Sequence, residues 1–143
     1  MDDVADEKRK PLGALDDRDW MLQTLVEWAN NGMNLPITVT VGAGFITGTL
    51  VSGKEYIEYV EKVYFPTSAG ETNDTLAQLF NYWKRPYEPG YEDDNDLGRF
   101  YIHLKDAKLF NNGAFVPNNG TYWRGRISSI DGFSLGELAK AED

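Results

Sequence analysis

Apolar side chains recur along this chain with two different periods, and the places where the period changes predict its elements. From Trp20 onward the apolar positions follow the 3.6-residue period of a helix. Asp16 and Asp17 are placed to cap its start, and Asn-Asn-Gly at 30–32 tolerates the left-handed conformation that ends helices. We expect the Trp20 and Trp28 side chains of this helix to pack against a sheet.

The period then changes to two, which predicts strands. Apolar residues alternate with threonines over 35–41, a Gly-Ala-Gly break follows at 42–44, and a β-branched run continues over 45–51. This pattern predicts a hairpin, within which Gly48 marks a bend or a bulge.

A helical period returns after this hairpin. Ser52 and Glu55 have the spacing of a capping box, and Pro66 stops the helix that they begin. Asp74 is placed to cap a second, shorter helix. The two helices form a predicted insertion over 53–85.

Strand-like alternation then resumes, with His103 on the polar face. The apolar parity slips by one residue at Lys105-Asp106, which predicts a bulge or a sharp bend in this strand. A Gly/Asn loop over 111–120 leads to a strand over 122–130, and Asp131-Gly132 predicts a final hairpin.

The strand that contains Trp123 presents alternate side chains on opposite faces. Trp123 shares one parity with Ile127, whereas Arg124 shares the other with Arg126. We therefore expect Trp123 to be structural. The two arginines should be available to nearby carboxylates or to an acidic partner.

The element order predicts an α+β fold: a small, strongly bent antiparallel sheet of about five strands, of the SH3-like or Sm-like barrel kind, with an N-terminal helix and the two-helix insertion. The alternative is an open α+β sheet with helices on one face. One globular domain is expected over 20–138. A flexible acidic leader over 1–19, a solvated acidic loop over 86–97 and a frayed tail over 139–143 complete the expected organisation.

Composition narrows the chemistry. The 143 residues include no cysteine and one histidine, so thiol chemistry and a multi-histidine metal site are excluded. His103 would be the base of any serine triad, but no Gly-x-Ser-x-Gly elbow accompanies it. We therefore expect no catalytic residue, no cofactor, no metal and no enzyme activity. Without an apolar signal or a spanning segment, the expected location is the cytosol.

Basic residues on the strands have two interpretations. Lys105, Lys108, Arg124 and Arg126 lie near aromatic residues, a mixture that single-stranded nucleic acid sites use. The net charge of −9 opposes that interpretation. We take these four residues and His103 as candidate protein-interaction residues, with an Sm-like RNA-binding module as the alternative.

Four segments resemble the gas-vesicle accessory protein U (GvpU) family. They are Ile46–Tyr56, Phe100–Leu109, Trp123–Ile127 and Asp131–Gly136, and with the preceding helix and strand they span most of 20–138. The motif residues taken as structural are Gly48, Glu55, Trp123, Gly125, Asp131, Gly132 and Gly136.

The resemblance implies a non-enzymatic role in gas-vesicle assembly or clustering, through contacts with the vesicle shell or another accessory protein. Self-association is expected from the residues themselves, because four Trp and eight Tyr are many for this length and a curved sheet exposes edge strands. A homo-oligomer is therefore predicted.

Overall fold

The computed structural model describes residues 17–66, 74–92 and 96–139. In these residues, five antiparallel strands form one sheet in the order β4-β3-β2-β1-β5. The strands are β1 (Leu35–Val41), β2 (Gly44–Val51), β3 (Tyr101–Asn111), β4 (Ala114–Arg126) and β5 (Gly132–Leu135). The α-helices are α2 (Trp20–Asn30), α3 (Gly53–Tyr64) and α4 (Asp74–Lys84), and the 3₁₀ helices are η2 (Arg85–Tyr87), η3 (Leu97–Arg99) and η4 (Ile127–Ser129).

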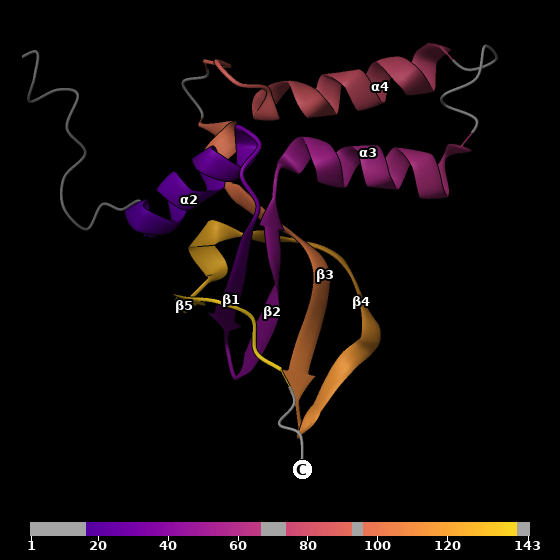
Figure 1. Cartoon of the computed structure of the whole chain (residues 1–143). Helices are drawn as coiled ribbons and strands as arrows, with labels where there is room; N and C mark the ends of the chain where they lie inside the picture. Colours follow the sequence, from indigo (N-terminus) through magenta and orange to yellow (C-terminus); the bar gives the residue numbers. More distant parts are fainter. Residues whose placement is uncertain (1–16, 67–73, 93–95, 140–143) are drawn as a thin grey trace, which may run out of the picture.

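Figure 1 shows α3 and α4 lying side by side at one end of the sheet, with α2 separate from them. This arrangement confirms the predicted α+β fold with its N-terminal helix and two inserted helices.

Both predicted strand irregularities are present. The register between β2 and β3 shifts at Gly48, where an added Cβ would lie 2.8 Å from the carbonyl oxygen of Lys105. Asp106 has a φ of 52°, and the register between β3 and β4 shifts on both sides of Ala107. Each shift changes the face of the sheet to which the following side chains point. This change explains why the apolar positions in the sequence move from even to odd numbers near Asp106.

The predicted loop over 111–120 is wrong. Asn112 and Gly113 have positive φ angles and form a tight turn, after which β4 begins at Ala114. The four residues 117–120 then stand opposite Lys108 alone, between the pairs Ala107–Thr121 and Leu109–Val116. An edge strand accommodates such an excess because its other side has no ladder to break.

The predicted hairpin at Asp131-Gly132 is also wrong. After η4 the chain crosses to the opposite edge of the sheet, where β5 pairs with β1. Asp131 directs this crossing: its N–H donates to the carbonyl of Thr40 at 2.9 Å, and its Oδ2 accepts from the N–H of Gly42 at 3.0 Å. The strands β4 and β5 do not pair within the described residues, so closure into a barrel stays a prediction.

Helix α2 begins at Trp20, where its apolar period starts, but its cap lies two to three residues after the predicted ones. Oδ1 of Asp19 accepts from the N–H groups of Met21 and Leu22, at 2.9 and 3.2 Å, so Asp19 is the N-cap rather than Asp17. Asp16 lies outside the described residues. A cap acts where its side chain reaches the first free N–H groups, and two aspartates further upstream cannot do so.

The expected packing of Trp20 and Trp28 against the sheet is wrong as well. Their side chains are 75% and 50% exposed. The face of α2 that packs on the sheet consists of Leu22, Leu25, Val26 and Ala29, which join the core side chains of β1, β2 and β3. Smaller aliphatic residues fill the space above the sheet, and the two indoles remain outside it.

A second, smaller core lies under the inserted helices and contains Ile57, Phe80 and Tyr87. Ser52 caps α3 as predicted, with its Oγ accepting from the N–H of Glu55 at 2.9 Å. α4 begins at Asp74, whose side chain lies outside the described part. Tyr87 belongs to the predicted solvated loop, and its burial corrects that expectation for this residue, because the 3₁₀ turn η2 folds it back under α3.

Candidate protein-interaction site

His103 is buried, not solvent-facing, with only 1% of its surface exposed. The rings of Tyr56 and Tyr87 lie on it, each with its centroid 5.1 Å from the imidazole centroid. The sequence placed His103 on the polar face of a strand, but α3 and η2 cover that face here. His103 therefore cannot itself touch a partner, which corrects its place among the candidate interaction residues.

Burial lowers the pKa of His103 to about 3, and the neighbouring Arg124 charge acts in the same direction. The imidazole is therefore neutral near pH 7. Its Nε2 accepts a hydrogen bond from Nη1 of Arg124 at 2.6 Å.

Arg124 is held entirely by neutral groups in the described structure. Nη1 also donates to the Tyr87 hydroxyl at 2.8 Å, and the guanidinium carbon lies 3.9 Å from the ring centroid of Tyr101. The residue nevertheless remains exposed. These contacts fix the orientation of a cation without neutralising it.

A pocket of about 630 Å³ opens beside Arg124. The inserted helices contribute four aromatic side chains to its wall: Tyr56, Phe80, Tyr82 and Trp83. The segment after α4 and strand β3 contribute three more: Tyr87, Tyr91 and Tyr101. Among the described lining residues, the charged groups are Arg85 and Arg124.

The other predicted basic residues do not line this pocket. Lys105 and Lys108 are half-buried on β3 opposite Thr49 and Thr47, and Arg126 is exposed opposite Tyr101. None of the three lines the pocket. The structure thus joins His103 and Arg124, whereas the remaining candidates lie outside the pocket lining.

The sequence pattern does not predict the aromatic lining of the pocket. Tyr56, Phe80 and Trp83 have helical spacing, which explains them equally well as the apolar faces of two ordinary helices. Tyr56 and Trp83 belong to different helices, and their meeting depends on how α3 packs on α4. Lys84 Nζ and Glu61 Oε1 link the two helices at 2.9 Å. The unusual number of tyrosines in the inserted segment was the available signal.

The motif residues taken as structural have specific positions. Glu55 accepts a hydrogen bond from the Tyr122 hydroxyl at 2.8 Å, and burial together with this carboxylate raises the pKa of Tyr122 to about 12. Trp123 packs against the main core, and a Cβ at Gly125 would overlap its indole. This overlap explains the small residue two positions after the tryptophan.

The last two glycines of the motif set lie at the two ends of β5. Gly132 stands opposite Thr40 in the ladder, and Gly136 has a φ of 101°. The N–H of Gly136 donates to the carbonyl of Pro36 at 2.8 Å. A side chain at 136 would be strained in this left-handed conformation.

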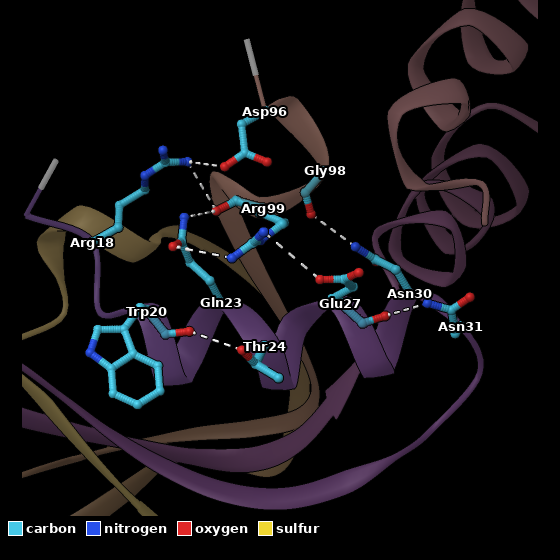
Figure 2. A network of polar contacts seen from close by, with 10 residues as sticks. All are labelled: Arg18, Trp20, Gln23, Thr24, Glu27, Asn30, Asn31, Asp96, Gly98 and Arg99. Atoms are coloured by element: carbon cyan, nitrogen blue, oxygen red, sulfur yellow. Dashed lines mark hydrogen bonds and ion pairs between the residues drawn. The ribbon is translucent and has the colours of Figure 1, made fainter. Parts of the chain in front are cut away.

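Helix α2 is tied to η3 by polar contacts on one side, which Figure 2 shows. Gln23 Nε2 donates to the carbonyl of Arg99 at 3.2 Å, and Arg18 pairs with Asp96 at 3.1 Å. Trp20 extends away from this network in Figure 2. The helix therefore has a packed side, a polar side and an exposed apolar side that includes Trp20, Met21 and Trp28.

A family model described as gas vesicle protein GvpU-like matches residues 19–138. This protein belongs to the GvpU-like family. The match covers α2 to β5 and confirms the resemblance carried by the four sequence segments. No curated protein and no solved structure matches the chain.

The GvpU-like match places the protein among gas vesicle accessory proteins. No helix in the described part has the length and apolar character that a membrane span requires. Within the same residues, no group of three or more histidine, aspartate or glutamate side chains is arranged to hold a metal ion.

Proposed function

We propose that this GvpU-like protein is a non-enzymatic cytosolic adaptor that binds the gas-vesicle shell or another accessory protein, binds itself, and so helps vesicles to assemble or cluster. The family match supports the gas-vesicle context. The exposed apolar side of α2 carries the adaptor role, because large side chains left in solvent are typical of surfaces that another protein covers.

Self-association is supported by the two free sheet edges. The outer edge of β4 includes the exposed Val116, and β5 leaves its far side unpaired in the described residues. Unpaired N–H and C=O groups along such edges accept a further strand.

Deletion of the gene from a vesicle-forming host tests the proposed function. We expect vesicle yield or spatial distribution, seen by electron and phase-contrast microscopy, to change on deletion and to be restored by the wild-type gene. A Trp20→Gln/Trp28→Gln gene should fail to restore it, whereas Val63→Gln, which removes an exposed apolar side chain from α3, should succeed. Unchanged vesicles after deletion would refute the proposal.

RNA binding by an Sm-like module remains the competing hypothesis. Lys105, Lys108 and Arg126 do not line the pocket beside Arg124, and the net charge of −9 favours the protein-binding alternative. A fluorescent oligonucleotide at low salt distinguishes the two functions, because nucleic acid binding weakens steeply as salt rises.

A further inference from the structure

The pocket beside Arg124 is a feature that the adaptor role does not yet explain. Its volume of about 630 Å³ lies within the range of ligand sites, which is roughly 300–1,000 Å³. Tyr82, Trp83 and Tyr91 at this pocket are exposed. Large aromatic groups therefore remain uncovered at an opening into the fold.

The charge of the pocket is opposite to that of the protein. The whole chain has a net charge of −9, yet the charged groups among the described lining residues are the guanidiniums of Arg85 and Arg124. Arg85 stands 5.8 Å from the Tyr82 ring centroid, and both arginines are exposed. An anionic ligand would find complementary charge here and repulsion over much of the remaining surface.

Arg124 is held in place before any ligand arrives. Its contacts with His103, Tyr87 and Tyr101 fix the planar group but provide no negative charge. A guanidinium with free donors pairs best with a carboxylate or a phosphate. The mostly aromatic wall favours a ligand that combines one such anion with apolar side chains.

We propose that this pocket binds a peptide segment of a partner protein that places an apolar side chain against the aromatic wall and a carboxylate on Arg124. This inference deepens the proposed adaptor function and rests on it. A peptide is favoured over a nucleic acid because the site has two cations in a strongly acidic protein, which is little for a polyphosphate chain.

Two labelled, capped peptides test the proposal by fluorescence anisotropy with the full chain. One alternates Phe and Glu, and the other has Gln in place of each Glu. We expect the acidic peptide to bind at least about tenfold more tightly than its Gln analogue, since charge-assisted hydrogen bonds are the stronger ones. Equal binding of both peptides would overturn the proposal.

A matched pair of variants locates the effect. Arg124→Gln should abolish the preference for the acidic peptide, whereas Arg126→Gln removes the same charge two residues along β4 and should retain it. Should Arg124→Gln fail to fold, Trp83→Gln replaces it as the test variant and Val63→Gln as its control. Loss of acidic-peptide affinity in Trp83→Gln alone supports the pocket, and equal affinities in the two variants overturn it.

Two further assays separate the remaining alternatives. Competition distinguishes a peptide site from a nucleotide site. Vesicle binding distinguishes a failure of the pocket proposal from a failure of the adaptor proposal. Displacement of the acidic peptide by AMP or by a short oligonucleotide at equal concentration would show a nucleotide site and overturn the peptide assignment. In vesicle sedimentation assays, an Arg124→Gln protein that still binds vesicles would overturn the pocket as the docking site and leave the adaptor function standing. Peptide binding with no vesicle binding by the wild type would refute binding to the vesicle shell and retain the pocket.

Discussion

His103 shows what a single enclosed side chain contributes to stability. The groups that face it are Tyr56, Tyr87 and Arg124. The unfolded chain binds a proton at His103 near pH 6.5, whereas the folded protein does so only at about pH 3. Between these values the unfolded state carries the extra proton, so the stability is full above pH 6.5 and falls as the pH drops.

We expect His103 to reduce the free energy of unfolding by about 2 kcal/mol between pH 7 and pH 5. Urea unfolding followed by tryptophan fluorescence measures this change. The His103→Gln variant keeps an acceptor for Arg124 but does not titrate, so it should lack this part of the pH dependence. Identical pH profiles for the two proteins would show that His103 is not enclosed as described.

Asn30 connects three elements. Its Nδ2 donates to the carbonyl of Gly98 in η3 at 2.9 Å, and its Oδ1 accepts from the N–H of Gly53 at the start of α3 at 3.1 Å. Figure 2 shows its contact with Gly98 beside the exposed Asn31. One amide at the end of α2 thus holds the insertion to the N-terminal helix.

The Asn30→Ala variant should lose about 1–3 kcal/mol of stability, because it leaves two half-buried backbone groups without partners. The neighbouring Asn31 donates to Glu27 within its own helix in an exposed position. Asn31→Ala should therefore change stability by no more than about 0.5 kcal/mol. Equal effects in chemical unfolding would contradict the linking role of Asn30.

In the described residues, the sheet has two unpaired edge strands and α2 has an exposed apolar side, and self-association follows if these surfaces are used. Light scattering should give a mass above the 16.2 kDa of the monomer. Val116→Lys puts a charge on the β4 edge and should weaken association by about tenfold or more, since charged edges resist strand addition. Val63→Lys on α3 is the control. A constant monomer mass at all concentrations would refute the prediction.

Sequence patterns predicted those parts of the fold that depend on near neighbours. The turn after Val41, the Ser52 cap and the bulge at Asp106 each follow from residues within a few positions of one another. The same local patterns wrongly predicted that the two tryptophans of α2 pack against the sheet. Periodicity defines an apolar stripe, but the shape of the surface beneath decides which members of it are buried.

The sequence by itself thus determined the element order, the α+β class and the family. Only the tertiary structure decided that Asp131 leads the chain across the sheet to β1, that α3 and η2 cover His103, and that residues from α3, α4, β3 and β4 meet around Arg124. Each of these features joins residues far apart in the chain. Their energies depend on packing between elements, which no local pattern of hydrophobicity or turn residues records.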